Sequence, residues 1–148
     1  MSVFASYDRE RLRRTYVEAW RRRRDGAPLT PLDALIADVV ALHPEYQPLL
    51  EDADSGVAFE ASPGGGENPF LHLGLHIAVR EQLSVDRPPG IRDLRRRLAA
   101  RQPEPHAAEH VLMEALAETL WEAQRAGRAP DEAHYLALVR RRLDAAPR

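Results

Sequence analysis

The sequence predicts an all-α protein, a helical bundle of five to six helices in which residues 1–148 form a single domain. Apolar residues recur every three or four positions along most of the chain, which is the period of an amphipathic helix. No segment alternates apolar and polar residues as a half-buried β-strand does. Two capping residues, Thr30 and Asn68, directly precede a proline, a combination that is typical of a helix start.

Two helices are expected in the first third of the chain. The first covers residues 7–25, with Ser6 as its capping residue. The second begins after Thr30, because Asp33 completes a capping box, and it ends before Pro44. The apolar side chains predicted to face inward are Leu12, Tyr16, Ala19 and Trp20 in the first helix and Leu32, Leu35, Ile36, Val39 and Leu42 in the second.

A glycine-rich segment, residues 51–67, is expected to be a flexible loop, because three consecutive glycines favour turns and mobility. It lacks the Gly-Lys-Ser/Thr ending of a phosphate-binding loop. Four more helices are expected after it, over residues 69–85, 91–101, 106–127 and 131–144. The side chains predicted to form their buried faces include Leu71, Leu75, Val79, Leu83, Leu112, Leu116, Leu120 and Trp121.

Composition excludes several classes of function. The chain has no cysteine, which excludes disulfides, zinc–thiolate sites and a cysteine nucleophile. Its 21 basic residues, all arginine, are balanced by 23 acidic ones, and the net charge of −2 argues against a nucleic-acid partner. No apolar run is long enough for a signal peptide or a membrane span, so a cytoplasmic protein with no membrane partner is expected. A homodimer is left open.

Two groups of histidines lie on helix faces that are otherwise apolar. In the longest predicted helix, Glu109 falls in the middle of the apolar stripe, with His106 and His110 beside it. In the helix after the glycine-rich loop, His72 and His76 are four residues apart and project from one face. A carboxylate in an apolar stripe needs a partner, and neutral imidazole and carboxylate both suit divalent cations.

The order of the helices predicts that the two groups meet. Short connections favour antiparallel neighbours, so the helices over residues 69–85 and 106–127, which one helix separates, should run parallel. Both groups then lie at one end of the bundle, which His43 and Tyr46 could also reach. The predicted ligands are His72, His76, His106, Glu109 and His110, and the predicted cofactor is a divalent transition metal, Fe, Mn, Ni or Zn. The site is mononuclear unless Glu114 also contributes; no catalytic residue is predicted.

Other interpretations of the same residues stay open. The histidines could be structural core residues of a non-catalytic protein-interaction module, hydrogen-bonded to Glu109, Tyr46 and Gln82. A haem held by histidines is a further alternative. A third is RNA or nucleotide association through the arginines at 21–24 and 95–97, although such runs usually form a solvated face. Whether the protein is an enzyme does not follow from its sequence.

Three segments carry distinctive patterns: PLTPLDALIADVVALHPEY, NPFLHLGLHIAVREQLSVDRPPGI and HAAEHVLMEALAETLWEAQRAG. With their NPFLH-x-x-x-H and H-x-x-EH motifs, they resemble a bacterial family catalogued as a domain of unknown function, number eighteen forty-one. The resemblance covers nearly the whole chain. It implies a small helical, cytosolic protein, and it brings no established activity or catalytic residues.

Overall fold

The computed structural model of the protein describes residues 3–52, 68–102 and 104–145. Within these ranges the chain forms seven α-helices and one 3-10 helix, and it contains no strand. The prediction of an all-α fold is therefore confirmed, with slightly more helices than the five to six expected. The predicted flexible loop over residues 51–67 lies outside the described residues apart from Glu51 and Asp52.

The chain divides into two compact units, Met1–Ile77 and Ala78–Arg148. The boundary between them falls inside one continuous helix, α5 (Pro69–Val85), so this helix supplies residues to both. Each unit has its own set of packed helices, and whether the two behave as a single domain stays a prediction. No helix in the described part of the chain is long and apolar enough to span a membrane.

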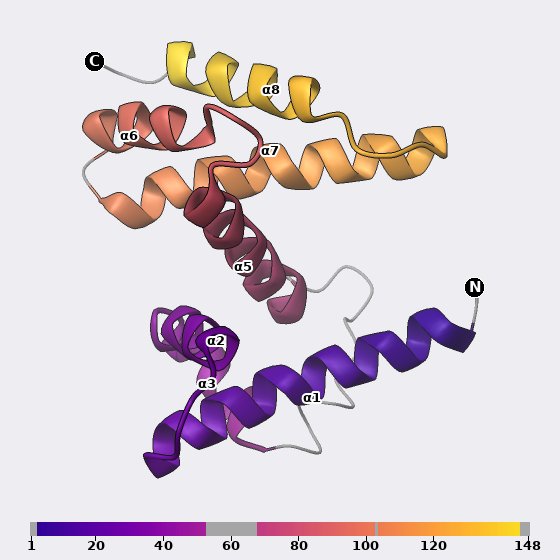
Figure 1. The fold of residues 1–148 in the computed structure, drawn as a ribbon, viewed down its shortest axis with the longest axis vertical. Coiled ribbons are helices and arrows are strands. Elements are labelled where there is room, and N and C mark those ends of the chain that lie inside the picture. Colours follow the sequence, from indigo (N-terminus) through magenta and orange to yellow (C-terminus); the bar gives the residue numbers. More distant parts are fainter. Residues whose placement is uncertain (1–2, 53–67, 103, 146–148) are drawn as a thin grey trace. The chain divides into compact units, whose positions relative to one another are not determined.

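The first unit is built on a long helix, α1 (Val3–Asp25), which packs against α2 (Pro31–Ala41) and the short α3 (Gln47–Glu51) (Figure 1). A 3-10 helix, η1 (Pro44–Tyr46), connects α2 to α3. The core of the unit consists of Tyr16, Val17, Ala19, Trp20, Ile36, Ala37, Val39, Val40, Leu50, Phe70, Leu73 and Ile77. The first half of α5 therefore contributes its apolar side chains to this core.

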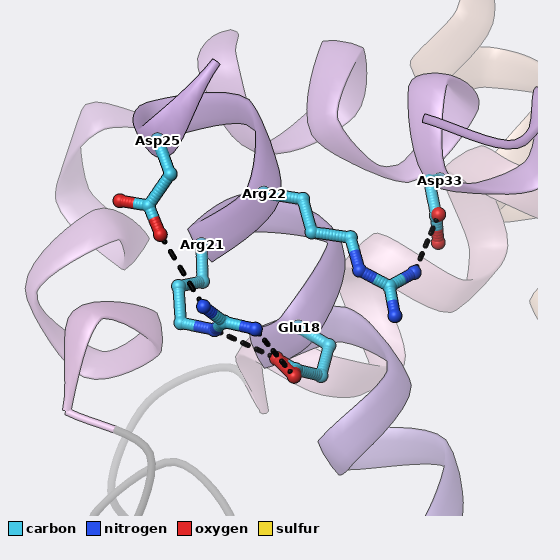
Figure 2. A network of polar contacts seen from close by, with 5 residues as sticks. All are labelled: Glu18, Arg21, Arg22, Asp25 and Asp33. Carbon is cyan, nitrogen blue, oxygen red and sulfur yellow. Dashed lines mark hydrogen bonds and ion pairs between the residues drawn. The ribbon is translucent and has the colours of Figure 1, made fainter. Parts of the chain in front are cut away.

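The start of α2 is fixed by the predicted capping box, which also ties α2 to α1. The Thr30 hydroxyl accepts a hydrogen bond from the Asp33 backbone N–H (3.1 Å), and the Asp33 carboxylate accepts one from the Thr30 N–H (3.2 Å). The same carboxylate accepts a hydrogen bond from Arg22 of α1 at 2.9 Å; Figure 2 shows this contact beside an exposed ion-pair network on α1. The Thr30 N–H, assisted by Arg22, holds the pKa of Asp33 below its ordinary value.

The second unit contains α6 (Ile91–Arg101), α7 (Pro105–Ala126), α8 (Glu132–Ala145) and the second half of α5. Figure 1 shows α6, α7 and α8 side by side, with consecutive helices running in opposite directions. Gly127, in the left-handed conformation with φ of 65°, ends α7. The buried side chains are Val79, Ile91, Leu94, Leu98, Ala108, Leu112, Met113, Ala115, Leu116, Ala123, Tyr135, Leu138, Val139 and Leu143.

A buried hydrogen bond joins α8 to the end of α5 within the second unit. The Tyr135 hydroxyl donates to the side-chain oxygen of Gln82 at 2.8 Å. Burial raises the pKa of Tyr135, so the phenol stays protonated and remains a donor. The contact fixes the place at which α5 enters this unit.

Several large apolar side chains predicted to be buried are exposed, and for these the prediction was wrong. They are Leu12, Leu32, Leu42, Leu71, Leu120 and Trp121. Periodicity gives the spacing of an apolar face but not its edges, and these positions flank the faces that pack. Trp121 has a local partner instead, because the guanidinium of Arg125 lies 4.6 Å from the centre of its ring. The first helix also begins earlier than predicted, at Val3, so Ser6 lies inside it.

Truncation of a buried leucine in α7 should lower the free energy of unfolding far more than truncation of a leucine on the exposed face of the same helix. Leu112→Ala should lower the free energy of unfolding by about 2–5 kcal/mol, because it leaves a cavity in the second unit. Leu120→Ala should cost less than about 1 kcal/mol, because this side chain is 41% exposed. Urea unfolding followed by circular dichroism gives both values. Equal losses would contradict the packing of α7.

Asp33 should make the stability of the protein depend on pH. A carboxyl whose pKa is lowered on folding stabilises the folded state above its unfolded pKa and loses this effect as pH falls through its folded value. Asp33→Asn should therefore destabilise the protein at pH 7, and the difference from wild type should shrink as pH falls below 3.8. Urea unfolding of both proteins at several pH values measures this difference in the free energy of unfolding.

The matched control is Asp38→Asn, which removes an exposed ion pair with Arg23 from the same helix. This change should cost less than Asp33→Asn at pH 7, because Asp38 takes no part in the capping box. A loss for Asp33→Asn that is the same at acid and neutral pH would show that the charge of Asp33 contributes nothing.

Candidate metal centre

Two of the predicted ligands, His72 and His76, lie one helical turn apart in the first half of α5. Their Nε2 atoms are 3.2 Å apart, and their rings meet edge to face with centroids 4.8 Å apart. His76 is fully buried, whereas His72 is half-buried. The spacing of four residues in the sequence therefore produces the side-by-side placement that it predicts.

A third histidine, His43, completes this group within the first unit. It lies between α2 and η1 and is buried, and its Nε2 is 3.1 Å from the Nε2 of His72. Its ring centroid is 4.7 Å from that of His76. The ring of Tyr46, one turn further along, stacks on His43 at 5.3 Å with the planes 5° apart. The first unit thus contains a trio, His43, His72 and His76, that we call the histidine trio.

The tautomer of His43 follows from its backbone contact. Its Nδ1 is 2.8 Å from the carbonyl oxygen of Val39. A carbonyl can only accept, so Nδ1 must carry the hydrogen and donate it. In the neutral ring, Nε2 then carries a lone pair, and this lone pair is on the atom nearest to His72. A hydrogen bond from the ring to a backbone carbonyl is also the usual support for a metal-binding histidine.

The second unit holds the other predicted ligands at the start of α7. The Nε2 atoms of His106 and His110 are 2.9 Å apart, and both rings are half-buried. Glu109 lies between them in sequence and is buried. Its carboxylate accepts hydrogen bonds from Arg80 of α5, from Nε at 2.8 Å and from Nη2 at 3.4 Å. The carboxylate thus has an arginine partner, and its role as a metal ligand stays a prediction.

Two further residues that the sequence raised lie in other surroundings. Glu114, the residue considered for a dinuclear site, forms an exposed ion pair with Arg142 at 2.7 Å. His134, the sixth histidine, contacts Glu122 across α7 and α8. Neither is part of the groups described above. Within the described residues, His43 and His76 of the first unit, and His106 and His110 of the second, are candidate ligands of a metal ion. His72 is not in this set, and its place in the trio rests on the contacts of its Nε2 with His43 and His76.

His43 is the residue that the sequence left unassigned. It comes one turn after Val39 and Val40, which lie on the buried face of α2. This spacing is the sequence feature that indicated a buried position for His43. Its contact with His72, 29 positions away, depends on how α2 packs against α5, which no local pattern specifies. Whether the histidines of α7 share an ion with the trio stays a prediction.

Over the residues that the structure describes, the protein is all-α, with histidines near the start of α5 and of α7 that are candidate metal ligands. The chain has no cysteine and so no thiolate. The chain belongs to the family described as Domain of unknown function (DUF1841), whose model matches residues 8–141. No curated protein and no solved structure matches it.

The pair Arg80–Glu109 should stabilise the second unit more than an exposed pair on the same helix. Glu109→Gln leaves the half-buried guanidinium of Arg80 without its charged partner and should lower the free energy of unfolding by about 1–3 kcal/mol. The same change at Glu114, whose pair with Arg142 is exposed, should cost less than about 1 kcal/mol. Urea unfolding of both variants tests this. Equal values would mean that burial does not strengthen the contact.

Proposed function

We propose that this protein binds a divalent transition-metal ion through the histidine trio. The observation that carries the proposal is the meeting of three Nε2 atoms around His72, with contacts of 3.1 and 3.2 Å. All three imidazoles come from one unit, and two of them are buried. The proposal concerns binding, and no reaction or catalytic residue is assigned.

The hydrogen bonds that the three Nε2 atoms could make with one another cannot all form at once. Each Nε2 either carries one hydrogen or offers one lone pair. Because His43 presents a lone pair, its contact with His72 needs the hydrogen to sit on the Nε2 of His72. The same atom then has no lone pair left to accept a hydrogen from His76. At most one good hydrogen bond thus forms between neutral rings, whereas a central cation is bound by all three lone pairs.

The distances between the nitrogens suit a shared ion. Two ligand nitrogens at about 2.0–2.1 Å from an ion, at a tetrahedral angle, are about 3.3 Å apart. At right angles they are about 2.9 Å apart. The contacts of 3.1 and 3.2 Å within the trio lie between these two values. These two contacts therefore support a shared ion.

The chemistry of the donors favours metals that accept imidazole. Nitrogen ligands suit zinc, nickel and iron, whereas manganese prefers sites richer in oxygen. The one buried carboxylate near these histidines in sequence, Glu109, already has Arg80 as its partner. The chain has no cysteine, so a site that selects metals through thiolates is excluded. Of the four metals considered from the sequence, zinc, nickel and iron fit the trio best.

The number of ligands decides what a bound ion could do. Three protein ligands leave a position open for water or substrate, whereas a complete set of protein ligands is typical of a structural site. His106 and His110 of the second unit are the other histidines among the predicted ligands, and their contribution stays a prediction.

Metal binding should depend on the trio and not on histidines in general. Purified without a tag, the protein should bind one zinc or nickel ion in calorimetric titrations, and His72→Ala should weaken binding by about a hundredfold or more. The matched control is His134→Ala, the sixth histidine, which should leave the affinity unchanged. Binding should also weaken as pH falls, because protons compete with the metal ion for the imidazole lone pairs.

Two results would overturn this proposal. One is a protein that binds none of zinc, nickel, iron or manganese tighter than about 10 μM, a weak affinity for a site with three protein ligands. The other is an equal loss in His72→Ala and His134→Ala. Either result would favour the alternative, an interaction module with structural histidines. His106→Ala and Glu109→Gln, titrated in parallel, then show whether α7 supplies ligands.

A further inference from the structure

A second site is suggested by an arginine-lined groove in the second unit, between the end of α5 and the start of α6. The groove has a volume of about 620 Å³, and four arginines line it together with Ser84, Leu83 and Ala99. These arginines are Arg80, Arg92, Arg95 and Arg96. No aspartate or glutamate is among the lining residues. A concave surface with one sign of charge attracts a ligand of the opposite sign.

Three of the four guanidinium groups are held by neighbouring groups of the protein. Arg80 binds Glu109, and Arg96 binds Asp93 one turn before it. Arg92 donates to the backbone carbonyls of Leu83 and Ser84 near the end of α5, the first at 2.6 Å. The carboxylate of Asp86 also lies close enough to interact with the charge of Arg92. The charges of these three arginines are therefore balanced at least in part by acidic neighbours.

Arg95 is the exception. It forms no hydrogen bond or ion pair with the described residues, and its Nε is buried without a partner. A buried donor of this kind is costly, because its hydrogen bonds to water have been lost and nothing replaces them. Its neighbour on α6, Arg97, shows the ordinary case, an exposed ion pair with Asp93 at 2.9 Å. Arg95 is thus the arginine of the groove whose guanidinium has no acceptor in the described part of the chain.

We infer that this groove binds a small phosphorylated molecule, with Arg95 as its main ligand. A phosphate group offers several oxygens and up to two charges, and the planar guanidinium donates to it in pairs. Arg92 supplies further donors, and Leu83 and Ala99 give an apolar wall for the rest of the molecule. The volume lies within the range of small-molecule sites.

A long polyanion fits these observations less well. The chain as a whole carries a net charge of −2, so no general positive field attracts nucleic acid. The lining of the groove includes arginines and no acidic residue, whereas Arg97 outside it is already paired with Asp93. The groove and the histidine trio share no residue. The proposal of a phosphate site can therefore be tested independently of the proposal of metal binding.

Calorimetric titration with inorganic phosphate, pyrophosphate and adenosine monophosphate tests the inference, with a chelator present so that no metal contributes. Arg95→Gln should weaken the tightest of the three by about tenfold or more, because it removes a charge-assisted contact. The matched control Arg97→Gln makes the same change of charge on the same helix and should alter the affinity by less than about twofold. Arg95→Lys, which keeps the charge but loses the planar fork, should give an intermediate loss.

Three outcomes would overturn the inference. The first is no binding of any of the three compounds at millimolar concentration. The second is an equal loss in Arg95→Gln and Arg97→Gln, which would indicate a general effect of charge. The third is an RNA oligonucleotide that binds more tightly than pyrophosphate and is weakened equally by both substitutions. Circular dichroism of the variants establishes that they fold.

Discussion

The first unit depends on a single constraint: three imidazole nitrogens occupy a space in which each can offer either one hydrogen or one lone pair. The carbonyl of Val39 removes the freedom of His43 by fixing its hydrogen on Nδ1. Its Nε2 then presents a lone pair to His72, and His72 can serve only one of its two neighbours well. A cation would resolve the conflict for all three rings, and this is the reason for proposing that the trio binds a metal ion.

The local structure around the trio explains how these rings are brought together. The capping box of Thr30 and Asp33 sets where α2 begins, and Pro44 follows the last residue of its buried face, His43. The spacing of four residues in α5 places His72 beside His76. Each step is ordinary helix chemistry. The unusual feature is that all three polar rings lie where apolar side chains would otherwise complete a core.

Much of the fold could be predicted because its signals are local. Capping residues, prolines and Gly127 mark the helix ends, and the all-α class follows from periodicity. The edges of the buried faces could not be predicted, as Leu120 and Trp121 show, because they depend on which helices pack. The contact of His43 with His72 was not predictable for the same reason. Both are tertiary properties of the chain.

Electrostatic contacts divide the charged residues of the second unit into two kinds. Glu109 and Arg80 are paired and partly buried, so their charges hold α7 against α5. Arg95 has no such partner in the described part of the chain, although its Nε is buried. In the sequence, Arg95 is one member of a run of three arginines. Only the contacts in the folded protein distinguish it from Arg97, which has Asp93 as its partner.

The most direct test of the central claim is nuclear magnetic resonance of the histidine side-chain nitrogens, recorded with and without zinc. The account predicts that His43 carries its hydrogen on Nδ1 in both states and that His72 carries its hydrogen on Nε2 without zinc and on Nδ1 with zinc. It also predicts that zinc shifts the Nε2 resonances of the trio while those of His134 stay in place. Nε2 resonances of the trio that do not respond to zinc, or a hydrogen on the Nε2 of His43, would contradict it.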